Sequence, residues 1–252
     1  MNFKEKVLKS LSKSCNSCNS CNKTVYSLWM GPDLSIIEIL SIMSFLKNGH
    51  KYILYTYGDI KNIPNGVEVR DGSKILSEDC FQKVKINCPD KYYTTFANWF
   101  RCEMLYCHGG WWVDLDIICL KYLDFTSPYV FSQFNQIDDM GNQMVNNGII
   151  KSPSRTSIFK FYKDMFKDID EKIPFGATGP GCFYYIIKKY GLTTCIYPTI
   201  IFEPKYDVDI FKKDVEVSPD TYAIHLHNSQ SSCKNKTWVH NSLMEKLKRT
   251  YL

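Results

Sequence analysis

Two aspartates, one residue apart, are the side chains of this sequence best suited to bind a metal ion. Asp114 and Asp116 follow the pair Gly109-Gly110 and lie within an otherwise apolar run over 111–120. In a strand, residues i and i+2 point to the same face, so the two carboxylates should project together. Hard divalent ions such as Mg²⁺ or Mn²⁺ relieve such repulsion and combine carboxylates with phosphate oxygens. We therefore predict a metal site, and expect that removing either charge leaves the metal-free fold no less stable.

Most D-x-D triplets are exposed, solvated strand ends, and that reading is the alternative for this pair. The apolar residues on both sides of the aspartates favour a buried site instead. A helix predicted over 92–108 should end at the glycine pair and lead into the aspartate strand. Asn98 and Arg101 lie three residues apart in this helix, so they share a face directed towards the aspartates. These four polar side chains form the candidate site.

The segments before the helix predict a β-α-β unit. Residues 24–29 and 52–57 have the composition of strands, and 36–46 carry apolar residues at helical spacing after the capping box Ser35-x-x-Glu38. This order gives a parallel sheet with nucleotide-type sites at the carboxyl ends of its strands. No glycine-rich dinucleotide motif or P-loop follows a predicted strand, which argues against those two classes.

The composition indicates one globular domain over 23–252 behind a flexible polar leader over 1–22. The sequence is 44% hydrophobic and 15% aromatic and contains no Pro/Gly/Ser-rich linker. Its net charge of +5 suits an anionic ligand such as a nucleotide but falls short of a nucleic-acid-binding signature. No apolar run reaches the ~18 residues that span a bilayer. We therefore expect a cytoplasmic protein with no transmembrane segment, whose basic N-terminus allows peripheral membrane contact.

The eleven cysteines are odd in number, which is typical of free thiols in a reducing compartment rather than of a disulfide framework. Several lie in apolar runs and are expected to be buried: Cys102, Cys107, Cys119, Cys182 and Cys195. In the leader, Cys15, Cys18 and Cys21 could offer thiolates to Zn²⁺, but no fourth Cys or His lies nearby. A low-complexity leader is therefore expected.

The string Asn98-x-x-Arg101, Leu105-Tyr106, Gly109-Gly110-x-Trp112-x-Asp114-x-Asp116 resembles the hallmark of the DxD sugar-transferase family. This family, glycosyltransferase family 32 and its relatives, includes alpha-1,4-galactosyl and initiating alpha-1,6-mannosyl transferases, capsular polysaccharide synthesis transferases and, more distantly, the clostridial glucosylating toxins. The resemblance implies an α/β fold of the GT-A, nucleotide-diphospho-sugar transferase type. Such a fold has a mixed, mostly parallel sheet flanked by helices.

The resemblance also implies a metal-dependent hexosyltransferase. It would move a sugar from a nucleotide-diphosphate donor, a UDP-sugar foremost, to a hydroxyl of a glycan, lipid-linked or protein acceptor, with retention of configuration. Asp116 would bind Mn²⁺ or Mg²⁺ directly, and Asp114 would contact the ribose and metal-bound water. Asn98 and Arg101 would contact the donor sugar and the pyrophosphate region. The family more often has Asp at the position of Asn98, so the donor is left open.

Two further segments resemble parts of the family's substrate site. Trp29, at the end of the first strand, would lie near the nucleotide base, and an ordinary core tryptophan is an equally good reading. Asn146-Asn147-Gly148 resembles a segment that lines the acceptor side, and a simple turn explains it as well.

The end of the chain resembles the family's closing strand and loop. His225 and His227 should share a face of a late strand, and His225, or next to it Asn228, would complete the metal or diphosphate site. Trp238 follows a polar loop over 229–236 that resembles a mobile flap closing over the diphosphate. Trp238 is therefore a candidate nucleotide-sugar contact.

Two other functional classes are compatible with parts of the sequence. The run Val113–Ile118 also resembles the D-x-D of haloacid-dehalogenase-type phosphatases, with the first Asp as nucleophile and Asp138-Asp139 as distal acids. That motif normally opens its domain, has Thr or Val where this chain has Ile118, and leaves the Gly-Gly pair unexplained. The other class is a non-catalytic sugar- or nucleotide-binding module of the same fold, which only Asn98 supports.

Overall fold

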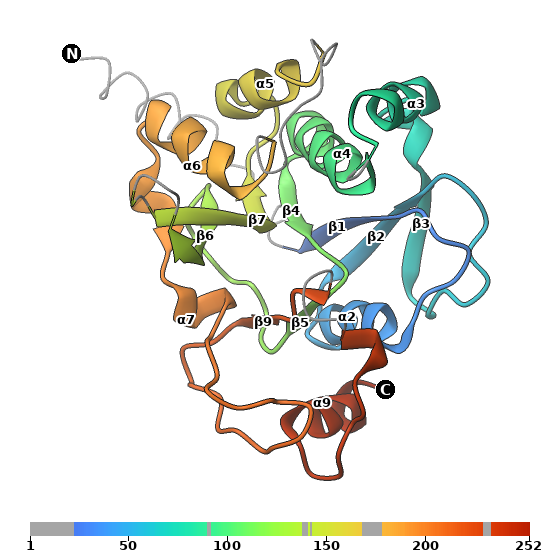
Figure 1. Cartoon of the computed structure of the whole chain (residues 1–252), viewed down its shortest axis with the longest axis vertical. Helices are drawn as coiled ribbons and strands as arrows, with labels where there is room; N and C mark the ends of the chain where they lie inside the picture. The colour runs from blue at the N-terminus through green and yellow to red at the C-terminus, as the bar shows by residue number, and fades with distance from the viewer. Residues whose placement is uncertain (1–22, 90–91, 138–140, 142, 168–177, 229–232) are drawn as a thin grey trace.

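The chain forms an α/β fold in which helices cover both faces of a seven-stranded sheet, with a two-stranded sheet beside it (Figure 1). These counts refer to the part of the chain that the computed structural model describes, residues 23–89, 92–137, 141, 143–167, 178–228 and 233–252. The leader over 1–22, with Cys15, Cys18 and Cys21, lies outside these residues, as do Asp138 and Asp139.

The large sheet is mixed and mostly parallel, as the sequence predicts. Its strands, in spatial order, are β3 (Val67–Asp71), β2 (Lys51–Thr56), β1 (Thr24–Trp29), β4 (Gly110–Val113), β7 (Gln143–Ser152), β6 (Val130–Ile137) and β8 (Ile196–Tyr197). The pairs β1–β2, β1–β4, β2–β3 and β6–β8 are parallel. Strand β7 runs antiparallel to both of its neighbours, β4 and β6. The predicted β-α-β unit is confirmed by the parallel pairing of β1 with β2.

Helices pack on the two faces of this sheet in two layers (Figure 1). The upper layer consists of α3 (Glu78–Asn87), α4 (Tyr92–His108), α5 (Ser157–Asp164) and α6 (Pro180–Lys189). The lower layer consists of α2 (Ile36–Lys47) and α7 (Thr199–Phe202), and α9 (Leu243–Tyr251) packs against α2 below this layer. Short 3₁₀ turns are η1 (Gly72–Lys74), η2 (Thr193–Cys195) and η3 (Cys233–Asn235). The predicted capping box opens α2, where the Ser35 N–H donates to Glu38 Oε2 over 2.7 Å.

Strand β4 is apolar on both faces because it lies between two hydrophobic clusters. Trp112 belongs to the cluster under the upper helices, with Phe96 and Phe100 of α4. Trp111 and Val113 belong to the cluster on the opposite face. Both tryptophans are buried. A strand covered on both faces carries a continuous apolar run rather than an alternating one, and this holds β4 rigidly beneath the aspartates that follow it.

The second sheet joins the aspartate region to the end of the chain. Strand β5 (Ile117–Cys119) pairs antiparallel with β9 (Ala223–His225), and Ile117 lies opposite His225. Helix α2 fixes this sheet through two buried serines: Ser41 Oγ donates to the Ile117 carbonyl over 2.7 Å, and Ser44 Oγ accepts from the Cys119 N–H over 2.8 Å. These contacts place His225 beside the aspartate turn.

The prediction that Asp114 and Asp116 share one strand is wrong. Strand β4 ends at Val113, β5 begins at Ile117, and the chain turns between them, with the Ile117 N–H directed to the Asp114 carbonyl over 3.3 Å. The turn arises because β4 belongs to the large sheet and β5 to the small one. Strand β9 likewise ends at His225, and His227 lies beyond it with a φ of 49°. Sheet alternation therefore positions neither pair.

The cysteines of the described residues are all free, as expected for thiols outside a disulfide framework. Of those expected to be buried, Cys102 and Cys119 are, Cys182 and Cys195 are partly so, and Cys107 is exposed. Cys107 lies near the end of α4, where its side chain leaves the core. Among the helices that the structure describes, none has the length and hydrophobicity needed to traverse a bilayer.

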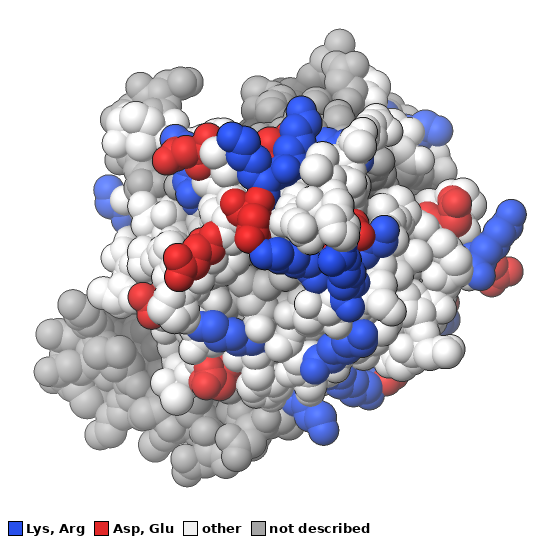
Figure 2. Space-filling model, turned by 90° about the horizontal axis from the view of Figure 1, so that it is seen from below, with Lys and Arg blue, Asp and Glu red and all other residues white. Residues whose placement is uncertain are grey.

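The face that carries α9 has charges of both signs. Figure 2 shows Lys and Arg side chains there beside Asp and Glu side chains. Ion pairs join Lys246 to Asp214, Lys248 to Glu245 over 3.7 Å and Lys236 to Asp209 over 3.6 Å. Positive and negative side chains are therefore interspersed on this face.

Candidate active site

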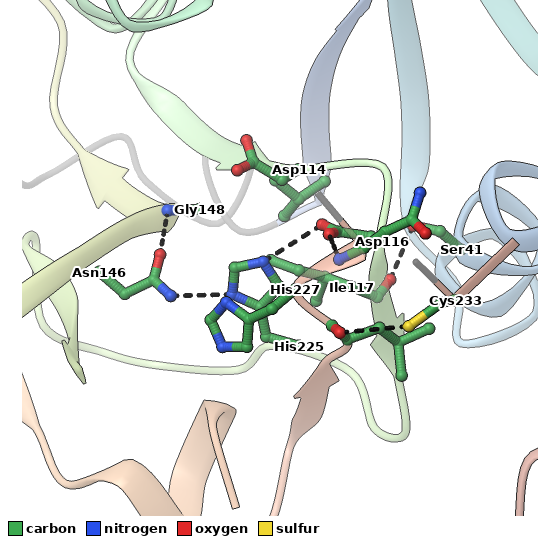
Figure 3. A network of polar contacts seen from close by, with 12 residues as sticks. Ser41, Asp114, Asp116, Ile117, Asn146, Gly148, His225, His227 and Cys233 are labelled. Carbon is green, nitrogen blue, oxygen red and sulfur yellow. Dashed lines mark hydrogen bonds and ion pairs between the residues drawn. The ribbon is translucent and has the colours of Figure 1, made fainter. Parts of the chain in front are cut away.

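Asp114, Asp116 and His225 converge although they come from a turn and a distant strand (Figure 3). One ligand atom from each lies within 4.8 Å of the others. Asp116 Oδ1 is 3.2 Å from His225 Nε2, and Asp116 Oδ2 accepts a 2.7 Å hydrogen bond from the Asn228 N–H. Two carboxylates and one imidazole form a donor set that suits Mn²⁺ or Mg²⁺, with room for phosphate oxygens. The residues therefore fit the predicted metal, and His225 lies where it could supply a third protein ligand.

Arg101 and Trp112 hold Asp114 in place. Arg101 Nη2 and Trp112 Nε1 each lie 2.7 Å from Asp114 Oδ1, and the guanidinium carbon lies 4.9 Å from the centre of the Trp112 ring. Arg101 is only 4% exposed, so it is not the surface arginine that the sequence left as an alternative. Both hydrogen bonds end on Oδ1, and Oδ2 is therefore the oxygen that a ligand would use.

The two aspartates differ in how strongly they hold a proton. Burial raises the pKa of Asp114, and the charge of Asp116 adds to this, although Arg101 opposes it. Burial also disfavours the charged form of Asp116, but His225 and the Asn228 N–H outweigh it and lower the pKa of Asp116 to about 2. The pKa of His225 rises to about 10, because Asp116 and Glu203 outweigh its burial. In the metal-free protein a charged imidazole therefore compensates the carboxylates, and Asp116 is the firmer anion.

The amide oxygen of Asn98 accepts hydrogen bonds from other residues of the protein. Asn98 Oδ1 accepts from Arg101 Nη1 over 3.1 Å and from Asn147 Nδ2 over 2.9 Å, and the residue is 5% exposed. Because the oxygen already has two donors, any bond from Asn98 to a sugar hydroxyl would be donated by its Nδ2. An aspartate at this position would offer only acceptors, so the asparagine gives the site a donor that an aspartate would lack.

The segment 146–148 lies in β7 and contacts the aspartate site, so the reading of this segment as a simple turn is wrong. Asn146 Nδ2 is 2.8 Å from His225 Nδ1, and Asn146 Oδ1 accepts from the Gly148 N–H over 2.5 Å. The Gly148 carbonyl in turn accepts from the Asp114 N–H over 2.7 Å. The backbone of β7 thus fixes where the aspartate turn begins.

Gly148→Ala is expected to lower the binding of UDP with Mn²⁺ at least about tenfold and to cost about 1 to 3 kcal/mol of stability through overpacking. A Cβ at Gly148 would lie 2.8 Å from His225 Cε1, 2.9 Å from Asn146 Oδ1 and 3.1 Å from Asp114 Oδ2. All three side chains would have to move from the positions that converge on the metal. The measurement is calorimetric titration of UDP with Mn²⁺ present, alongside a thermal melt. Gly58→Ala is the matched control, because a Cβ there meets nothing within 4 Å, and equal affinities for the two variants would contradict the expectation.

Trp29 lines a cavity at the carboxyl end of β1. The cavity has a volume of about 310 Å³ and is lined by Leu28, Trp29, Met30, Gly31, Tyr93 and Ala97. Trp29 also packs against the hydrophobic cluster that contains Trp111 and Val113, and its Nε1 donates to the Asp33 carbonyl over 3.0 Å. A cavity of this size at a carboxyl strand end can accept an aromatic ring. The reading of Trp29 as a core contact is confirmed by this packing. A role at the nucleotide base stays a prediction, for which the cavity leaves room.

Trp238 packs in a hydrophobic cluster with Phe211. It lies against Phe211, with ring centres 5.6 Å apart, and Lys248 Nζ is 5.6 Å from its ring centre. These contacts belong to the hydrophobic cluster that joins α2, β9 and α9. Residues 229–232 of the predicted flap lie outside the described part of the chain. A role for Trp238 at the nucleotide sugar stays a prediction.

Glu203 is the site residue that the sequence reading missed. It follows α7 and is 2% exposed, with Oε1 3.2 Å from His225 Nδ1 and Oε2 3.4 Å from His227 Nε2. The available signal was a single acidic residue directly after the apolar run Ile200–Phe202 and before Pro204. A carboxylate in such a run must find compensating partners when it is buried.

The chain is similar to several solved structures, whereas no protein-family model and no curated protein matches it. The PaToxG glycosyltransferase has 17% sequence identity and a TM-score of 0.49, over 77% of this chain and 83% of that one. The UDP-bound glycosyltransferase domain from the YGT toxin has 8% identity and a TM-score of 0.43, over 68% of each chain. A structure described as a mutant transferase has 11% identity and a TM-score of 0.43, over 69% of this chain and 87% of that one. Since these TM-scores lie below 0.5, we base the function on the site itself.

Proposed function

We propose that the chain is a metal-dependent glycosyltransferase of the GT-A type. It would transfer a hexose from a nucleotide-diphosphate sugar, a UDP-sugar foremost, to a hydroxyl of a glycan, lipid-linked or protein acceptor. The observation that carries the proposal is the convergence of Asp114, Asp116 and His225 directly after a central strand of the sheet. A transferase of this kind needs charge compensation at the departing diphosphate more than a strong nucleophile.

Each polar residue of the site has a role in this proposal. Asp114, Asp116 and His225 would hold Mn²⁺ or Mg²⁺, which as a Lewis acid stabilises the negative charge on the leaving diphosphate. Arg101 keeps Asp114 oriented by the 2.7 Å contact, and Asn98 would donate to a hydroxyl of the donor sugar. The family resemblance implies retention at the transferred sugar, and we assign no covalent nucleophile.

The place of the aspartates in the fold disfavours the haloacid-dehalogenase alternative. The motif of that family normally opens its domain, whereas these aspartates follow the β1-α2-β2 unit. The bonding of Asp114 does not separate the two classes, because its Oδ2 is left for a ligand of either kind.

Product analysis tests the proposed function. The full chain is incubated with Mn²⁺ and, in turn, UDP-glucose, UDP-galactose, UDP-N-acetylhexosamines and GDP-mannose. A transferase should slowly release nucleoside diphosphate and free sugar from the right donor even without an acceptor. Release of inorganic phosphate from a sugar phosphate, abolished by Asp114→Asn, would overturn the proposal. Tight nucleotide binding without turnover of any donor would favour the binding module.

Trp29→Ala is expected to weaken UDP binding by about 1 to 3 kcal/mol, the range that aromatic–base stacking contributes in single-strand binders. The reason is its place in the wall of the cavity beside Tyr93 and Ala97. Titrations of UDP and GDP against both proteins measure the change, and unchanged affinity with an intact fold would assign Trp29 to the core alone. The same titrations on Trp238→Phe test the second predicted aromatic contact.

A further inference from the structure

Glu203, His225 and His227 form a second cluster of ligand atoms beside the aspartates. One atom from each lies within 4.8 Å of the others. Glu203 contacts the His225 Nδ1 at 3.2 Å and the His227 Nε2 at 3.4 Å. Ligand atoms around a tetrahedral Zn²⁺, with bonds near 2.0 to 2.2 Å, lie roughly 3.3 to 3.6 Å apart. The two contacts of Glu203 are therefore close to the spacing of ligand atoms around Zn²⁺.

The burial of the cluster also matches a cation site. The side chain of Glu203 is 1% exposed and that of His225 is 7% exposed, whereas that of His227 is 28% exposed. A buried carboxylate must be compensated by a positive charge or by hydrogen bonds. The exposed edge of His227 gives an ion a path from solvent and leaves a position for water as a fourth ligand.

The two faces of the His225 ring separate this cluster from the aspartate site. Nε2 lies 3.2 Å from Asp116 Oδ1, as Figure 3 shows, and Nδ1 lies 3.2 Å from Glu203 Oε1. A neutral imidazole has one unprotonated nitrogen, so an ion bound at Nδ1 would leave Nε2 protonated and directed at Asp116. His227 stacks on His225 with ring centres 3.8 Å apart. The aspartate site is rich in oxygen, which suits Mg²⁺ or Mn²⁺, whereas two nitrogens and one carboxylate suit Zn²⁺.

We propose that Glu203, His225 and His227 form a second divalent-cation site, selective for Zn²⁺-like ions. The site would tie the end of β9 to the segment after α7, beside the hydrogen bonds that Thr221 and Tyr222 make to the carbonyls of α7. It goes beyond sugar transfer and is tested apart from it: the two clusters share His225, and Glu203 and His227 supply ligand atoms only to the second.

Asn146 competes with the ion at this site. Its Nδ2 lies 2.8 Å from His225 Nδ1, the atom that the cation would use. Both this amide group and the ring proton of the charged imidazole must leave Nδ1 before a cation can bind. Asn146→Ala should therefore strengthen cation binding, whereas the loss of any ligand should weaken it.

Zn²⁺ titration of the full chain, stripped with chelator, tests the proposal. Affinity is measured by competition with a chromophoric chelator, and Co²⁺ replaces Zn²⁺ to give the visible absorption of a tetrahedral site. His227→Gln and Glu203→Gln should weaken Zn²⁺ binding at least about tenfold, and Asn146→Ala should strengthen it. Asp114→Asn should leave it unchanged, as should the control His240→Gln, which removes an exposed imidazole bonded to Arg249.

The outcomes separate this inference from the proposed function. Zn²⁺ affinity unchanged by His227→Gln, or reduced as much by Asp114→Asn, would overturn the second site and leave Glu203 as a residue that only orients His225. Should Glu203→Gln fail to fold in a thermal melt, His227→Gln decides, because its side chain is partly exposed. Mn²⁺-dependent UDP binding is measured on the same proteins. If the wild type shows no Mn²⁺-dependent UDP binding while the Zn²⁺ affinities of the variants follow the expected order, the proposed sugar transfer is refuted and the second site stands.

Discussion

Asp116→Asn should abolish metal-dependent turnover at any practical concentration of Mn²⁺. Asp116 is the firmer anion of the pair, and the substitution removes the charge that holds the cation. Asp114→Asn should also lose activity but keep weak metal binding, because Asp114 Oδ1 is already occupied by Arg101 and Trp112. Mn²⁺ titrations with and without UDP, beside donor turnover, measure both effects. Full activity in chelator, or in Asp116→Asn, would make the pair structural and refute a metal-dependent mechanism.

The same substitution should also destabilise the metal-free protein, by about 2 kcal/mol at pH 7. The sequence suggested no loss, since one of two like charges is removed. In the structure, however, Asp116 gains more from His225 and the Asn228 N–H than it loses by repulsion, and its pKa falls to about 2. A lowered pKa gives stability that is present above the pKa of the unfolded chain and is lost as the pH falls through about 2.

Chemical denaturation in chelator measures this effect. The difference in unfolding free energy between wild type and Asp116→Asn should be largest near neutral pH and shrink as the pH approaches 2. Asp114→Asn is the comparison, because burial and Asp116 raise the pKa of Asp114. A variant Asp116→Asn that is as stable as the wild type at pH 7 would show that repulsion within the pair dominates after all.

Arg101→Met should lower the free energy of unfolding by about 3 kcal/mol and abolish turnover. Removing one partner of a buried pair leaves the other charge uncompensated, and Asp114 would keep only Trp112 Nε1 on its Oδ1. In a domain of this size, such a loss lowers Tm by roughly 6 to 12 °C. Arg101→Lys should be intermediate, because an ammonium cannot reach Asp114 and Asn98 in the fork geometry of a guanidinium.

Thermal and chemical denaturation of a matched set tests the role of Arg101. Arg70→Met removes an exposed arginine paired with Glu68, whose side chains are 37% and 38% exposed, and should cost under about 1 kcal/mol. Adding Asp114→Asn to Arg101→Met should recover part of the lost stability, because the buried charge is removed. No recovery would mean that Arg101 stabilises the fold by packing on Trp112, not by compensating Asp114.

The sequence by itself determined the elements whose signals are local. The capping box Ser35-x-x-Glu38 forms at the start of α2, and the helix predicted over 92–108 is α4. Its spacing places Asn98 and Arg101 side by side, with 3.1 Å between Oδ1 and Nη1. These features depend on residues three or four apart, and helix geometry fixes such distances whatever the rest of the chain does.

Strand β3 and helix α3 have weak local signals and were not predicted from the sequence. Strand β3 is an edge strand on which Val69 is exposed, and among the residues of α3 Val84 alone is buried. Neither presents the broad apolar face on which periodicity depends. The start of helix α9 could have been predicted, since Ser242 is an N-cap residue whose side chain accepts from the Glu245 N–H.

Only the tertiary structure decided how the site is assembled. Asp114 and Asp116 converge because the chain leaves one sheet and enters another between them, and strand periodicity cannot show which sheet a segment joins. The pairing of β5 with β9 then brings His225 to Asp116, and α7 brings Glu203 to His225. These partners lie far apart along the chain, so their contacts depend on long-range packing. The local sequence around each residue does not indicate such packing.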